Sequence, residues 1–157
     1  MVSTVIEMDA LLQREESDAS TKWAELPEIS LRYDHFLGDV LLVIDGVDLS
    51  ARWGWVPVLD FALGFTELVG GLRPGATEVF EFTESEAHLR VSAVGDLVEV
   101  TASFASGRAQ VDRAELRLSA MAFLRGLVTR ISVEHPALSY NPHLALAVNR
   151  ACSVFPG

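Results

Sequence analysis

Two tight-turn signals, Asp45-Gly46 and Gly95-Asp96, constrain the fold of this chain more than any other feature of its sequence. Two-residue hairpin turns need positive φ angles, which glycine and aspartate tolerate. Residues 40–44, before the first turn, are wholly apolar, and residues 97–104, after the second, are mostly apolar at every second position. Both patterns are typical of strands. Because a two-residue turn joins antiparallel neighbours, the sequence predicts antiparallel sheet.

Three strands are expected on each side of a central helix. They are residues 29–34, 40–44 and 47–53, and then residues 77–84, 87–94 and 97–105. Between the two groups, apolar residues recur at three- and four-residue steps from Val58 to Leu72, which is the period of an amphipathic helix. Pro57 suits the first turn of this helix, and Gly70-Gly71 suits its end.

A second helix is expected to begin at the capping box of Asp112 and Glu115, or at Ser119 after an extra strand. His135-Pro136 ends this helix, because proline disfavours helical geometry in the residue before it. Asn141-Pro142 then begins a last helix, with asparagine as the N-cap and proline at the first helical position.

This order of elements predicts an α+β fold, with an antiparallel sheet from two three-stranded meanders packed against two or three helices. Residues 23–157 are expected to form this single α+β domain. Residues 1–22 are expected to be an N-terminal helix or a flexible segment. In the helical interpretation, Val5, Met8, Leu11 and Leu12 share one face.

The net charge of −10 is unevenly distributed along the chain. Residues 1–86 carry 17 acidic and 5 basic side chains, or −12, whereas residues 87–157 carry 5 acidic and 7 basic ones, or +2. An acidic surface repels phosphate, so nucleic acid is not an expected partner. No apolar run approaches the roughly 20 residues that span a bilayer, so no membrane partner is expected. A single cysteine, Cys152, and a start without a signal-peptide pattern favour a cytoplasmic location.

The stretch from Val56 to Asn141, with VPVLDFALGFTELV, FEFTES and AELRLSAMAFLRGLVTRISVEHPALSYN, resembles a group of uncharacterised small actinobacterial proteins of unknown function. The shared features are apolar patterns and the His-Pro and Asn-Pro pairs. This resemblance implies a bacterial protein and carries over no catalytic residue. The order of elements is also similar to that of small acidic secretion chaperones and toxin-immunity proteins, at the level of fold alone.

The leading hypothesis is a non-catalytic protein-binding module of immunity, chaperone or accessory type. It would use its acidic surface to bind a basic protein or peptide, and no cofactor, metal site or catalytic residue is expected. Trp53 and Trp55 are candidate anchors, because tryptophan offers a large, rigid and amphipathic surface. The alternative for these two side chains is a place in the core. The candidate acidic residues are Asp45, Asp48, Glu81, Glu84 and Glu86.

Two other hypotheses come from different functional classes. A small enzyme or ligand-binding domain would have a pocket between sheet and helices, with His88, His135 and His143 as the reactive residues. Against it, His135 and His143 lack the i, i+4 spacing of helical metal ligands, and each suits a helix end. A homodimer would be joined through an exposed strand edge or through the N-terminal segment.

Overall fold

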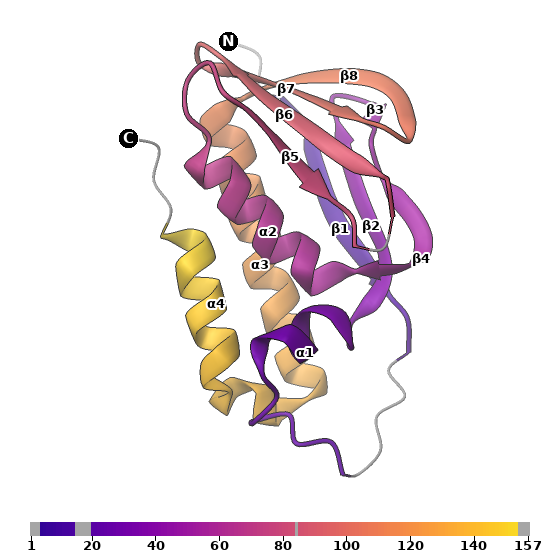
Figure 1. The fold of residues 1–157 in the computed structure, drawn as a ribbon, viewed down its shortest axis with the longest axis vertical. Helices are drawn as coiled ribbons and strands as arrows, with labels where there is room; N and C mark the ends of the chain where they lie inside the picture. Colours follow the sequence, from indigo (N-terminus) through magenta and orange to yellow (C-terminus); the bar gives the residue numbers. More distant parts are fainter. Residues whose placement is uncertain (1–3, 15–19, 84, 154–157) are drawn as a thin grey trace.

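A computed structural model describes residues 4–14, 20–83 and 85–153. Its elements pack as two antiparallel sheets against a layer of helices (Figure 1). They run in the order β1 (Ile6–Leu12), α1 (Glu28–Tyr33), β2 (Leu37–Ile44), β3 (Val47–Asp48), β4 (Ala51–Pro57), α2 (Val58–Gly71), β5 (Thr77–Glu81), β6 (His88–Val94), β7 (Leu97–Ala102), β8 (Ala105–Asp112), α3 (Arg113–Glu134), the 3-10 helix η1 (Pro136–Tyr140) and α4 (Pro142–Cys152).

Each sheet has four strands, and every pairing is antiparallel. In the first sheet, β2 pairs with β1 along one side and with the short strands β3 and β4 along the other. In the second sheet, β5 to β8 follow one another as a meander. The predicted α+β class with antiparallel sheets is therefore confirmed, but each sheet contains one strand more than the three expected.

Most of the predicted turns and helix ends are confirmed. Asp45 and Gly46 have φ angles of +48° and +80° in the β2–β3 turn, as a two-residue hairpin requires. Asp112 caps α3 by accepting a hydrogen bond from the Glu115 N–H at 3.1 Å, and the extra strand β8 also forms before it. His135 ends α3, as expected.

The expected N-terminal helix is wrong for residues 6–12, which form the strand β1. Ile6, Met8 and Leu12 alternate with Glu7 and Asp9, which is a period of two that competes with the helical spacing in so short a stretch. The ladder with β2, from Ile6 opposite Ile44 to Leu12 opposite Gly38, decides between the two periods.

The expected strand at residues 29–34 is also wrong, because Glu28–Tyr33 is the helix α1. Pro27 precedes it in an extended conformation, and Arg32 Nε lies 2.8 Å from Glu28 Oε2 in an i, i+4 ion pair of the kind that stabilises helices. Leu31 faces the core, whereas Ile29 is exposed.

Helix α2 lies at the centre of the molecule. Ten of its 14 residues are buried, and it contacts α1, α3, α4 and strands of both sheets. The Phe61 ring packs against the rings of Phe65, Phe80, Phe82 and Phe123 at centroid distances of 5.2–6.2 Å. This aromatic cluster ties the helix to the second sheet and to α3.

A chain of ion pairs connects α2, α1 and α4. Asp60, only 7% exposed, accepts a 2.7 Å hydrogen bond from Arg32, and Arg32 also pairs with Glu28. Arg150 of α4 donates to both oxygens of Glu28 at 2.7 Å. Hydrogen bonding from Arg150, reinforced by Arg32, lowers the pKa of Glu28 against the opposing effect of partial burial. Burial alone would lower the pKa of Arg32, but Asp60 and Glu28 outweigh it and raise this pKa.

Neutralising Glu28 should reduce stability in a pH-dependent way. The folded pKa of Glu28 lies below the ordinary value of 4.5, so its ionised form stabilises the fold above that pH, and this contribution is lost as the pH falls through the folded pKa. We expect Glu28→Gln to lower the free energy of unfolding by about 1 kcal/mol at pH 7 and by progressively less as the pH falls from 5 to 3. Urea unfolding across this pH range measures the difference. Glu25→Gln, at an exposed position, is the matched control and should have almost no effect; an equal loss in both variants would contradict the prediction.

Asn141 is predicted to be the most sensitive polar residue at the base of the helices. Its buried side chain accepts from the His143 and Leu144 N–H groups and donates to the Trp23 and Leu26 carbonyls at 2.8 and 3.0 Å. Asn141→Ala loses the cap and both donated hydrogen bonds, so it should lower the free energy of unfolding by about 2–3 kcal/mol. Asn141→Asp keeps the cap but cannot donate, so it separates the two roles. Thermal and urea unfolding of both variants test this, and a wild-type midpoint for Asn141→Ala would refute it.

Candidate functional site

The two candidate tryptophans occupy different environments. Their rings stack at a centroid distance of 5.2 Å and an interplanar angle of 23°. Trp53 is half-buried and meets Phe82 and Phe104 edge-on, so it joins the first sheet to the second. Trp55 is 44% exposed and adds the outer ring of this stack. Trp53 therefore contributes to the core boundary, and Trp55 alone offers a free indole surface.

The candidate acidic residues do not gather around these tryptophans. Asp48 lies opposite Val43, near one end of β2, whereas Val56, beside Trp55, lies opposite Gly38 at the other end. Asp45 accepts a hydrogen bond from the Val5 N–H at 3.0 Å and so holds the start of β1.

Asp48 is tied to its own strand connection. Hydrogen bonds from Ser50, and then from Arg52, lower the pKa of Asp48 to about 2. Glu81 and Glu86 are exposed at the end of β5 and in the β5–β6 connection, and Glu84 lies outside the described residues. Of the described candidates, Asp45 and Asp48 therefore lie at the other end of the first sheet from Trp55, and Glu81 and Glu86 belong to the end of β5 and the connection after it.

The three candidate histidines have separate surroundings. His135 stacks on Trp23 at 3.9 Å, with His35 on the same indole at 4.9 Å. His88 Nδ1 lies 3.2 Å from the Glu86 carbonyl in its own loop, and His143 is exposed on α4. Five surface hollows of 330–580 Å³ have no histidine among their lining residues.

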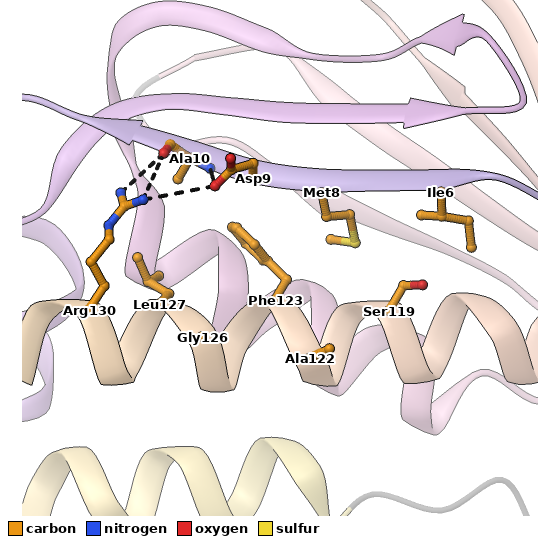
Figure 2. A pocket seen from close by; sticks show the side chains of 10 residues that line it. All are labelled: Ile6, Met8, Asp9, Ala10, Ser119, Ala122, Phe123, Gly126, Leu127 and Arg130. Carbon is orange, nitrogen blue, oxygen red and sulfur yellow. Dashed lines mark hydrogen bonds and ion pairs between the residues drawn. The ribbon is translucent and has the colours of Figure 1, made fainter.

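A groove of about 420 Å³ lies between strand β1 and helix α3 (Figure 2). The side chains of Ile6 and Met8 point from the strand toward the helix, and Phe123 and Leu127 rise from the helix toward the strand. On the helix side the groove is also lined by the small residues Ser119, Ala122 and Gly126. A Cβ atom added at Gly126 would meet nothing within 4 Å. Small residues on α3 therefore keep this space open.

The backbone of β1 is unpaired along the groove. Among the described residues, β1 pairs with β2 only, so it is an edge strand. The Asp45 N–H donates to the Val5 carbonyl, and the Gln13 N–H donates to the Leu37 carbonyl. Because hydrogen-bonded residues alternate along an antiparallel strand, the odd-numbered residues of β1 are the ones bonded to β2. The N–H and C=O groups of Ile6 and Met8 consequently point toward the open edge, where no described residue pairs with them.

At Ala10 the same edge is closed by side chains. Both terminal nitrogens of Arg130 donate to the Ala10 carbonyl at 3.1 Å, and Asp9 Oδ1 accepts from the Ala10 N–H at 2.8 Å. The Arg130 guanidinium also lies 3.9 Å from this carboxylate. Such side-chain contacts are a common protection of edge strands. At the other end, the Thr4 N–H donates to Glu115 Oε2 of α3 at 3.3 Å, so side chains of α3 protect both ends and leave Ile6 and Met8 open between them.

The outer face of β1 is acidic. Glu7 and Asp9 are exposed, and their neighbours on β2 are Val43 and Leu41. Asp48 flanks Val43 from the other side. The groove is thus apolar toward α3 and carries negative charge on its solvent side.

Sequence analysis missed this site because it expected residues 6–12 to be helical or flexible. The alternation of Ile6, Met8 and Leu12 with acidic residues was the available signal for the strand. The small residues Ala122 and Gly126 in an otherwise bulky helix were a second signal.

The described residues contain no group of three or more His, Cys, Asp or Glu side chains that could hold a metal ion. Of the helices in the described ranges, none has both the length and the hydropathy that a bilayer span requires. No family model, curated protein or solved structure was found to match the chain.

Proposed function

We propose that this chain is a non-catalytic protein-binding module that recognises a basic protein or peptide. The observation that carries the proposal is the open groove between β1 and α3, which is lined by apolar side chains and by the Asp9–Arg130 pair, with Glu7 exposed on the outer face of β1. Apolar interiors with charged rims are typical of protein-binding surfaces. A basic partner gains both apolar burial and electrostatic steering there.

The distribution of charge supports a basic partner. The outer face of the first sheet carries Glu7, Asp9, Asp39 and Asp48, against Arg52 as a basic side chain on β4. Helix α3, by contrast, carries Arg113, Arg117, Arg125 and Arg130 and only two acidic residues, Glu115 and Glu134. Long-range attraction would therefore bring a basic partner to the sheet face and not to the exposed face of α3.

The histidine environments favour binding over catalysis. His135 serves as the helix cap and stacks on Trp23, and His88 is occupied in its own loop. An immunity, chaperone or accessory role would suit a module of this kind. The setting that we propose is cytoplasmic, supported by the single cysteine of the sequence.

Selection from a displayed library of random peptides on the immobilised protein tests the proposal. We expect the selected peptides to be enriched in Lys and Arg. Their affinity should fall several-fold between 50 and 500 mM NaCl, because salt screens the rim charges. Glu7→Lys should weaken binding, whereas Glu67→Lys, on α2, is the matched charge control. Selected peptides that are neutral or acidic, or affinities independent of salt, would refute the basic-partner proposal.

A further inference from the structure

We propose that the partner binds by strand addition: an extended segment pairs with the open edge of β1 and places alternate side chains in the β1–α3 groove. The segment would have apolar residues at the positions that face α3 and Lys or Arg at the intervening positions. This inference rests on the proposed function, and it names the binding mode and the sequence pattern of the partner.

The first support is the hydrogen-bonding capacity of the edge. Ile6 and Met8 direct two N–H and two C=O groups outward at every second residue, which is the spacing at which an extended chain presents its own groups. Unpaired edges of this kind are templates for an added strand. In peptide recognition by strand addition, the main chain provides affinity and pockets for alternate side chains provide specificity.

The second support is the space beneath the edge. An added strand directs every second side chain toward α3, where Ala122 and Gly126 leave room beside Phe123 and Leu127 (Figure 2). Met8 is flexible enough to adjust its packing to a side chain entering beside it. Medium-sized apolar side chains such as valine therefore suit the inward positions.

The third support is the charge on the opposite face. The intervening side chains of an added strand would lie beside Glu7 and Asp9, both of which are exposed. Opposite charges on neighbouring strands stabilise a sheet, and like charges destabilise it. This favours Lys or Arg at the outward positions and makes the partner's pattern alternate with a period of two.

A second copy of β1 is a poor occupant for the same reason. Antiparallel pairing of two copies around Met8 would place Glu7 of each copy opposite Asp9 of the other. Pairing around Glu7 would set the two Glu7 side chains against each other. In both of these registers the edge is better suited to a basic partner than to a second copy.

Synthetic peptides test the pattern directly. The probe is a fluorescent peptide of sequence VKVKVKV, and the control is VVVVKKK, which has the same composition in two blocks. Fluorescence anisotropy at matched ionic strength should show the alternating peptide binding about tenfold more tightly or better. Alternate residues of an added strand direct their N–H groups toward β1. N-methylation of these residues should abolish binding, and N-methylation of the intervening residues should spare it. In antiparallel addition the sensitive set is the valines.

Two variants of the protein test the site. Met8→Pro removes an N–H that points to the open edge and is not needed by β2, so the sheet should persist while peptide affinity falls about tenfold or more. Met8→Leu keeps the N–H and is the matched control. Gly126→Leu fills the groove from a helical position with free space, and it should also abolish binding; far-UV circular dichroism and urea unfolding verify that each variant is folded. If one variant does not fold, the other decides.

The outcomes separate this inference from the proposed function. Strand addition is wrong, and the basic-partner proposal stands, if two results are found together. The first is that VVVVKKK binds as tightly as VKVKVKV, and the second is that Met8→Pro and Gly126→Leu bind basic peptides as tightly as the wild-type protein. If neither VKVKVKV nor any selected basic peptide binds, both are wrong. Sedimentation velocity adds a third result: a dimer that Met8→Pro dissociates would mean that a second copy occupies the edge, and it would overturn the inference.

Discussion

The burial of helix α2 is the constraint on which the rest of the structure depends. Its buried residues form more than a narrow stripe: Val58, Leu59, Phe61, Leu63 and Phe65 cover a wide arc of the circumference, and only the face with Gly64, Glu67, Leu68 and Gly71 is partly exposed. Such a helix is stable only when other elements cover this arc. The two sheets, α3, α4 and α1 provide this cover. Its buried charge, Asp60, is compensated by Arg32 of α1, so the same requirement also positions the shortest α-helix.

The open groove follows from this arrangement. Helix α3 is held by α2 and packs on the first sheet at its edge strand, β1. Because its residues facing that edge include Ser119, Ala122 and Gly126, the helix cannot fill the space beneath β1. On the other side of the strand, a Cβ on Gly38 would collide with the Leu11 carbonyl oxygen, so glycine at this position lets β2 approach β1 closely. Strong pairing on one side and small residues on the other leave β1 fixed but only partly covered.

Features that depend on a few adjacent residues could be predicted from the sequence. The Asp45-Gly46 turn, the Asp112 cap and the Asn141 cap each follow from local chemistry, and all three are present. The two wrong elements are the two shortest amphipathic stretches, residues 6–12 and 28–33, in which helical and strand periods fit about equally well. Tertiary partners decided them: the β2 ladder for the first, and Asp60 and Arg150 for the second. The groove depends on β1 and so could not be predicted without it.

Charge and hydrogen bonding contribute different parts of recognition at this edge. The acidic side chains act over about a Debye length, so they attract any basic chain and cannot by themselves distinguish one basic sequence from another. The unpaired backbone of Ile6 and Met8 accepts any extended chain, whatever its side chains. Only the combination is selective, because the groove interior and the Glu7–Asp9 face impose opposite requirements on alternate residues. A one-residue shift of a bound segment would place lysine in the groove and valine beside the carboxylates, which makes the register itself part of the specificity.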